Sequence, residues 1–145
     1  MPAYFDSSVL LSLLVGDALA GRAQKLWQAE TERVSSILLD VECTIVLRRA
    51  LTAGVTVADQ RAAEQRLDLA LDEVTLKPVD ETIAEIAHDT PALAGCRALD
   101  AVHLATALYF RAADPELRVC TFDARMSEVA RRLGFLVCDQ QSETA

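Results

Sequence analysis

Basic residues are scarce in this 145-residue sequence. It holds 14 lysine and arginine residues against 22 aspartate and glutamate residues, which gives a formal net charge of −8 at pH 7. The overall field of such a protein repels nucleic acids rather than attracting them. Any activity on a polyanion must therefore depend on local features, and we expect these in the segment 97–132, where six arginines accompany five acids.

Glycine and proline are also few, at five and four residues, and the sequence contains no repeats or low-complexity segments. These absences exclude collagen-like and disordered classes of protein. Hydrophobic residues make up 52% of the chain, which is ample for a packed core. At this length the composition predicts one globular domain over residues 1–145.

Two further absences concern the cellular compartment. The four cysteines lie far apart at positions 43, 96, 120 and 138, without a Cys-x-x-Cys pair, so we expect reduced core thiols rather than disulfides or a zinc site. No basic segment precedes the first apolar stretch, Val9 to Val15, and this stretch is too short to cross a bilayer. Both features predict a cytoplasmic protein that does not enter a membrane.

Short β-prone segments alternate with longer helical ones, a pattern typical of parallel strands joined by crossover helices. The predicted fold is therefore α/β, with a parallel sheet of about five strands between two layers of helices. Pro78 places the third strand at a sheet edge, because proline cannot donate a ladder hydrogen bond. We expect strands at 3–5, 33–37, 74–79, 117–122 and 135–137, and helices at 9–15, 18–30, 38–53, 57–72, 81–94, 101–112 and 124–133.

Three aspartates occur where a predicted helix begins. Asp6 and Asp123 lie at strand-to-helix junctions, and Asp100 opens the helix 101–112. In an open parallel sheet, ligands bind in the crevice beyond the carboxyl ends of the strands. Each aspartate also has a plainer interpretation, because aspartate is a preferred N-cap of helices.

Glu42 has no such alternative, because it lies inside the predicted helix 38–53. It shares a helical face with Leu38, Val41 and Ile45, so we expect its carboxylate to point inward. A buried charged carboxylate needs a cation, a basic partner or a raised pKa. Together with the three aspartates it would form an oxygen-only set, which suits Mg²⁺ or Mn²⁺ rather than zinc.

Four segments of the sequence resemble those of a known family. They are Phe5-Asp6-Ser7-Ser8, Ser35-Ser36 followed by Glu42, the run from Arg97 to Ala107 that contains Leu-Asp-Ala-Val-His-Leu-Ala-Thr-Ala, and Thr121-Phe122-Asp123. In order and spacing they are similar to PIN domains of the VapC toxin type. The resemblance spans residues 4 to about 137, and the Leu-Asp-Ala-x-His block is its most specific part.

This resemblance implies a three-layer α/β/α domain that acts as a Mg²⁺- or Mn²⁺-dependent endoribonuclease. Such a protein is the toxin of a toxin–antitoxin pair; it cleaves RNA and is held in check by a cognate antitoxin. The residues that match the family's metal-binding and catalytic quartet are Asp6, Glu42, Asp100 and Asp123, and those that match its supporting hydroxyl groups are Thr121 and either Ser7 or Ser8.

Three other residues have less specific interpretations. Arg97, just ahead of Asp100, could hold a phosphate or pair with an acid of the crevice. His103 has no obvious task in carboxylate chemistry, so we expect a packed or hydrogen-bonded helix residue. We expect Trp27 to be a helix-packing or interface residue, since aromatic residues are enriched at interfaces, and helices 18–30 and 57–72 carry more apolar surface than one small sheet needs. We therefore expect a homodimer, as in PIN toxins of this type.

Two other functions remain open. The four acids could be structural, in which case the domain would be a catalytically silent, PIN-like protein-interaction module. A haloacid-dehalogenase-type phosphatase also has an aspartate after its first strand, but its second acid, two residues further on, is replaced here by Ser8. A metal-dependent nuclease assay separates the enzyme from the silent module.

Overall fold

The protein, described here by a computed structural model over residues 2–139, is built on a five-stranded sheet in the order β3-β2-β1-β4-β5. All neighbouring strands are parallel. The predicted α/β fold with about five parallel strands is thus confirmed. The strands are β1 (Ala3–Phe5), β2 (Arg33–Ser36), β3 (Val74–Lys77), β4 (Arg118–Cys120) and β5 (Leu136–Cys138).

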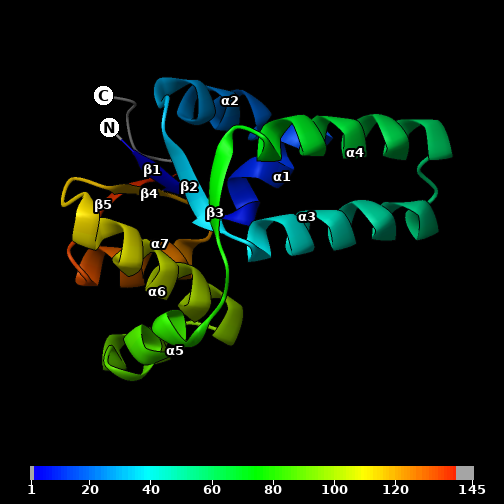
Figure 1. Cartoon of the computed structure of the whole chain (residues 1–145). Coiled ribbons are helices and arrows are strands. Elements are labelled where there is room, and N and C mark those ends of the chain that lie inside the picture. The colour runs from blue at the N-terminus through cyan, green and yellow to red at the C-terminus, as the bar shows by residue number, and fades with distance from the viewer. Residues whose placement is uncertain (1, 140–145) are drawn as a thin grey trace.

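Helices cover both faces of the sheet (Figure 1). Because parallel neighbours cannot be joined by a hairpin, each of the strands β1 to β4 is followed by at least one helix that carries the chain back. Within residues 2–139 the α-helices are α1 (Ser7–Val15), α2 (Ala20–Ala29), α3 (Leu38–Arg49), α4 (Val57–Leu71), α5 (Glu81–His88), α6 (Ala98–Ala113) and α7 (Ala124–Arg132), and the 3₁₀ helices are η1 (Ala50–Ala53) and η2 (Pro91–Gly95).

The two faces of the sheet have separate hydrophobic cores. Side chains alternate along β1, so Phe5 packs with α1, α2, α3 and α4 on one face, whereas Tyr4 packs with α5, α6 and α7 on the other. Both residues are fully buried. This arrangement is the three-layer α/β/α architecture that the resemblance implied.

Some boundaries differ from those predicted. The segment 81–94 is not one helix: α5 ends at His88, and Pro91 starts a separate 3₁₀ turn, because proline disfavours helical backbone in the residue before it. Helix α6 begins earlier than expected, with Arg97 as its N-cap. Asp100 therefore lies inside the first turn, where a negative charge interacts favourably with the helix dipole, and does not open the helix.

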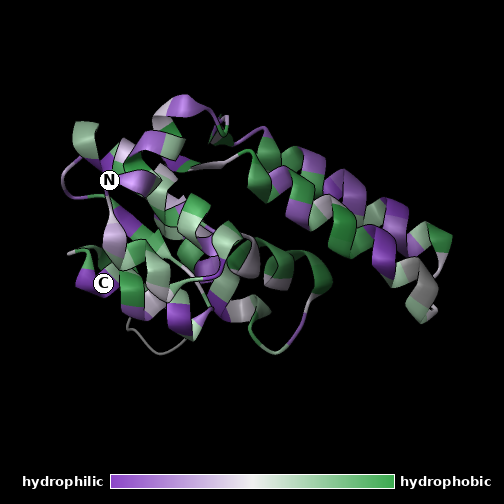
Figure 2. Cartoon of the chain, turned by 90° about the horizontal axis from the view of Figure 1, so that it is seen from below, coloured by the Kyte–Doolittle hydropathy of each residue, from purple (hydrophilic) through white to green (hydrophobic). Residues whose placement is uncertain are grey.

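Helices α3 and α4 form an antiparallel pair that projects from one side of the sheet (Figure 1). Gly54 lies in the turn between them with φ of +91°, a backbone conformation that favours glycine. Seen from below, hydrophobic residues are distributed along both projecting helices (Figure 2).

Across residues 2–139, no helix combines the length and the apolar character needed to cross a membrane.

Candidate active site

Four carboxylates from four different elements line one crevice at the carboxyl ends of β1 and β4. Asp6 follows β1, Glu42 lies in α3, Asp100 lies in the first turn of α6, and Asp123 follows β4. The crevice has a volume of about 370 Å³. The structure therefore brings together all four acids that the sequence singled out. The other lining residues are Ser7, Ser8, Arg97, Ala98 and Leu99.

Asp6 is the most deeply placed of the four acids, with 4% of its surface exposed. Its Oδ1 accepts hydrogen bonds from the Ser8 backbone N–H at 3.1 Å and the Ser8 hydroxyl at 2.6 Å, and its Oδ2 accepts one from the Thr121 hydroxyl at 2.5 Å. Burial raises the pKa of Asp6, and the bonds from Ser8 and Thr121 oppose that rise. Asp6 is thus an N-cap of α1 and also a member of the crevice.

Two hydroxyl groups connect the first acid to the fourth. The Thr121 hydroxyl, which donates to Asp6, also accepts the backbone N–H of Asp123 at 3.0 Å. The Ser8 hydroxyl, which also donates to Asp6, accepts the backbone N–H of Phe122 at 2.8 Å. Both serines matched by the resemblance line the crevice, and the hydroxyl of Ser8 donates to Asp6.

Asp100 and Asp123 are both half-buried, and their charges oppose each other. Burial raises the pKa of Asp100, and the negative charges of Asp123, Asp6 and Glu42 raise it further. Asp123 uses one oxygen to cap α7, accepting the Met126 backbone N–H at 2.8 Å. Mutual repulsion among the acids gives the crevice an affinity for a positive group.

Glu42 borders the crevice, but the helix face predicted for it is wrong. Its side chain is 24% exposed, while Val41 and Ile45, expected to be buried beside it, are 52% and 42% exposed. Helix α3 packs against α1 and α4 through a different stripe, so the apolar spacing alone misidentified its inner face. The buried stripe consists of Leu39, Cys43 and Leu47.

A histidine supplies the basic partner that Glu42 requires. The Nε2 of His103 lies 2.6 Å from Oε1 of Glu42, and its Nδ1 lies 2.6 Å from the hydroxyl oxygen of Tyr4. His103 is 1% exposed, so the prediction of a packed, hydrogen-bonded helix residue is confirmed. Tyr4 could not be predicted as a partner of His103, because a tyrosine in a short β-prone segment is an ordinary strand residue.

Arg97 and Trp27, the other two residues with a predicted role, differ in solvent exposure. Arg97 is exposed at the edge of the crevice and makes no ion pair with any residue in the described part of the chain. Of the two roles expected for Trp27, packing within the chain is confirmed and the interface role is wrong, because this side chain is 6% exposed and its ring packs against Phe5 with centroids 4.8 Å apart. Its indole N–H donates to Glu73, so even its polar edge is used within the chain.

The kind of donor in the crevice fits a hard divalent cation. All four acids offer oxygen, which Mg²⁺ and Mn²⁺ prefer, and no described cysteine lines the crevice. As the side chains stand, no three histidine, cysteine or acidic groups within residues 2–139 form a ready-made metal site. Mg²⁺ commonly keeps several of its waters and binds through one or two carboxylates, so a partial protein shell of this kind suits it.

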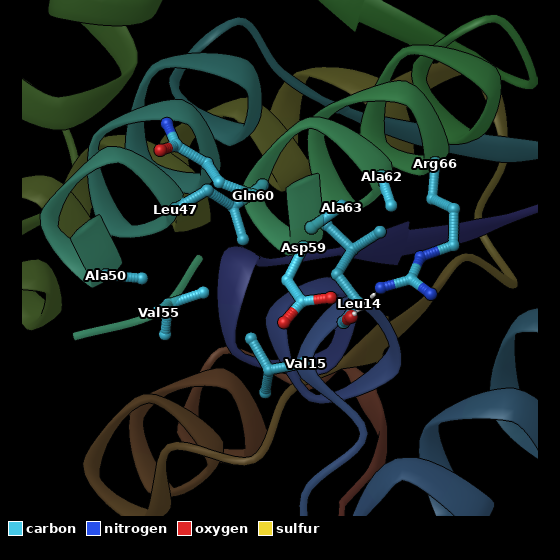
Figure 3. Close-up of a pocket in the computed structure, with 10 residues that line it drawn as sticks. All are labelled: Leu14, Val15, Leu47, Ala50, Val55, Asp59, Gln60, Ala62, Ala63 and Arg66. Atoms are coloured by element: carbon cyan, nitrogen blue, oxygen red, sulfur yellow. Dashed lines mark hydrogen bonds between the residues drawn. The ribbon is translucent and has the colours of Figure 1, made fainter. Parts of the chain in front are cut away.

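A second pocket, of about 350 Å³, lies between the end of α1 and the pair α3 and α4 (Figure 3). Its lining is mainly apolar, with Leu14, Val15 and Leu47 among the contributors, and Asp59 is its carboxylate. Arg66 donates to the backbone carbonyl of Leu14 at 2.7 Å across this pocket (Figure 3). Clustered acids are found in the crevice at the strand ends and not here, so the crevice is the candidate active site.

Comparison with known proteins identifies the family of the chain. The PIN domain family matches residues 3–132. Ribonuclease VapC46 of Mycobacterium tuberculosis is 34% identical over 134 residues, which cover 92% of this chain and 94% of that protein. The chain therefore shares both its family and nearly its whole length with a named ribonuclease.

Solved structures with low sequence identity share the fold. A toxin–antitoxin complex from Klebsiella pneumoniae gives a TM-score of 0.61 at 23% identity, covering 83% of this chain and 86% of that one. VapC20 of Mycobacterium tuberculosis, a toxin that cleaves the sarcin–ricin loop, gives 0.64 at 19% identity, covering 92% and 96%. The chain belongs to the PIN-domain family and, within it, to the VapC-type ribonucleases.

Proposed function

We propose that this protein cleaves RNA phosphodiester bonds with the help of Mg²⁺ or Mn²⁺, as the toxin of a toxin–antitoxin pair. The observation that supports this most directly is the convergence of Asp6, Glu42, Asp100 and Asp123 on one crevice. Four acids gathered at the carboxyl ends of parallel strands repel one another. A bound divalent cation would relieve this repulsion, which accounts for their convergence.

In this proposal Asp6 and Asp100 are the principal metal ligands, and Glu42 and Asp123 complete the shell directly or through water. When bound, the cation polarises a phosphoryl oxygen and lowers the pKa of a water ligand. Thr121 and Ser8 hold the Asp6 carboxylate in one orientation through the hydrogen bonds described above. Burial and the charges of the other acids raise the pKa of Asp100, so a nearby positive charge favours its ionised form.

Arg97 is the residue that we assign to the RNA backbone. It lies exposed at the crevice edge without an ion pair to a described residue, so its guanidinium is available to a phosphate. The net charge of −8 opposes RNA binding elsewhere on the surface. We therefore expect RNA binding to be weak, sensitive to salt and dependent on the divalent cation.

The test is the cleavage of RNA by Asp100→Asn, with Asp114→Asn as a matched control. Asp114 is exposed at the far end of the same helix, so its change removes one charge without touching the crevice. We expect Asp100→Asn to lose cleavage in Mn²⁺ and to keep its circular dichroism spectrum, while Asp114→Asn stays active. Full activity of Asp100→Asn would refute the metal assignment, and a folded wild-type protein without cleavage would favour the silent interaction module.

A cognate antitoxin is the second proposed partner. An arginine carried by such a protein would place its guanidinium among the four carboxylates, where bidentate pairing is strong. The antitoxin would then exclude the divalent cation, and titration of the complex with Mn²⁺ should show no binding. We also propose that the protein acts in the cytoplasm, where it encounters RNA and where its four free cysteines stay reduced.

A homodimer is proposed as well, but through a surface other than Trp27. Val41, Ile45, Val46 and Leu99 are 52%, 42%, 39% and 51% exposed and line a shallow apolar hollow beside Glu42. A second copy on this surface would bring two acidic crevices to the sides of one groove that could hold an RNA strand. Light scattering should then give twice the 15.8 kDa mass, and Ile45→Glu should halve it. Leu69→Glu, at an exposed position of α4, is the control.

A further inference from the structure

We infer that His103 is a positioning residue for Glu42, and that Tyr4 holds His103 in place for this task. The inference rests on the proposed function, because it assigns a role to residues behind a proposed metal ligand. Its observation is a continuous hydrogen-bonded chain from Tyr4 through His103 to Glu42, with both links at 2.6 Å. The chain connects β1, α6 and α3, which are the elements that also carry or adjoin the acids.

The direction of the hydrogen bonds follows from the chemistry of the three groups. The phenol of Tyr4 carries one O–H, which can donate to Nδ1 of His103 across the 2.6 Å contact. Nε2 of His103 then carries the ring proton and donates it to the Glu42 carboxylate. One tautomer of the ring satisfies both contacts, and it leaves the second oxygen of Glu42 for the crevice.

Such support matters because Glu42 is otherwise free to rotate. It lies on the surface-facing part of α3 between exposed Val41 and buried Cys43, and its side chain is 24% exposed. A long carboxylate side chain at such a position loses considerable rotamer entropy when a ligand fixes it. His103, 1% exposed and held on both ring nitrogens, removes that freedom before a ligand arrives. Residues behind metal ligands typically contribute 10- to 100-fold in affinity or activity.

The position of His103 in its helix makes it suited to this role. It lies three residues after Asp100, so both side chains project from the same side of α6. The helix therefore presents one acid to the crevice and, one turn later, the donor that holds a second acid. A histidine at this place couples the positions of Asp100 and Glu42, which come from different helices.

The experiment is a double-mutant cycle on Mn²⁺ affinity, measured by isothermal titration calorimetry on the full chain. We expect His103→Asn, whose amide is too short to reach Glu42, to weaken Mn²⁺ binding about tenfold. His103→Gln keeps an N–H donor near the position of Nε2 and should recover most of the affinity. His88→Asn, a change at the exposed histidine of α5, is the matched control and should bind as the wild type does.

The coupling in this cycle separates positioning from a merely structural role. In a Glu42→Gln background, His103→Asn should have no further effect on Mn²⁺ affinity, because the carboxylate that it positions is gone. Independent effects that multiply would overturn the inference, as would unchanged affinity in His103→Asn. If the His103 variants do not fold, Tyr4→Phe provides the test, because it removes the hydrogen bond to Nδ1 and keeps the one from Nε2 to Glu42. A wild-type Mn²⁺ affinity in this variant would refute the relay, that is, the hydrogen-bonded chain from Tyr4 through His103 to Glu42.

Failure of the proposed function gives a different result. In that case the wild-type chain itself binds no Mn²⁺, whatever residue stands at position 103. The ¹⁵N chemical shifts of His103 in the metal-free protein then still report whether Nε2 carries the proton. A proton on Nδ1 instead would contradict the relay with or without a metal.

Discussion

The hydrogen bond from Thr121 to Asp6 offers a sharp test of how the crevice is built. Thr121 is fully buried, and its hydroxyl donates to Asp6 at 2.5 Å while accepting the Asp123 backbone N–H at 3.0 Å. Thr121→Val nearly preserves the shape of the side chain and removes both bonds. A hydrogen bond to a charged group contributes about 1.5–3 kcal/mol.

We therefore expect Thr121→Val to lower the free energy of unfolding by about 2 kcal/mol at neutral pH. For a chain of this size that corresponds to a fall in Tm of roughly 6 °C. Urea unfolding followed by circular dichroism measures the first quantity, and calorimetry measures the second. Thr121→Ser keeps the hydroxyl and loses one methyl group, which costs about 1 kcal/mol, so it is the control.

The loss of stability in Thr121→Val should depend on pH, and the direction of this dependence follows from the pKa of Asp6. Burial raises the pKa of Asp6 above its value in the unfolded chain, so the contribution of this group to stability is largest at acidic pH and declines as pH rises through the folded-state pKa. Loss of the Thr121 donor raises that pKa further, because one bond to the charged form is gone. The gap between wild type and Thr121→Val should be small near the unfolded pKa of about 4 and larger at neutral pH. A gap that is equal at both pH values, or a Ser variant as unstable as the Val variant, would refute this reasoning.

Two further predictions concern Trp27, which is buried in the core, and Arg97, which makes no ion pair with a described residue. Trp27→Ala should destabilise the monomer by about 3–5 kcal/mol, because the ring is buried against Phe5; urea unfolding measures this, and an unchanged midpoint would contradict the burial. Arg97→Gln should weaken RNA binding in Mn²⁺ and reduce its salt dependence by about one phosphate contact, as measured by fluorescence anisotropy at several salt concentrations. Mn²⁺ affinity without RNA should stay unchanged in Arg97→Gln, and a parallel loss there would show that Arg97 instead supports the acids.

The fold was predictable from the sequence because its strands and helices alternate with clear boundaries. Pro78 correctly indicated an edge, since β3 is the outer strand beside β2, although the strand ends one residue before the proline. The predicted helix boundaries were wrong where one sequence feature is compatible with two local structures. Asp100 was taken to open its helix because aspartate is a common N-cap, whereas the structure starts α6 at Ala98 and uses the residue in the first turn.

The candidate site was predictable in its residues and less so in its contacts. Spacing predicted an inward Glu42 carboxylate on a buried face with Val41 and Ile45, but that face is exposed, because the helix carries apolar residues on more than one side. The two roles left open for Trp27 have a related cause: an aromatic residue suits an interface and a core equally well. The link between Tyr4 and His103 joins residues 99 positions apart, and no local pattern encodes such a pairing.

The acidity of the protein and its proposed substrate oppose each other, and the crevice shows how the conflict is resolved. Burial raises the pKa of Asp6, and burial together with the charges of the neighbouring acids raises the pKa of Asp100, so keeping both carboxylates ionised is costly. Under the proposed function, a divalent cation would remove that cost and at the same time reverse the local charge beside Arg97. Cation binding and RNA binding would then be coupled through the same four carboxylates, and each should strengthen the other by the same factor. An antitoxin arginine inserted among these acids would satisfy them as the cation does, and it would thereby silence the enzyme without changing its fold.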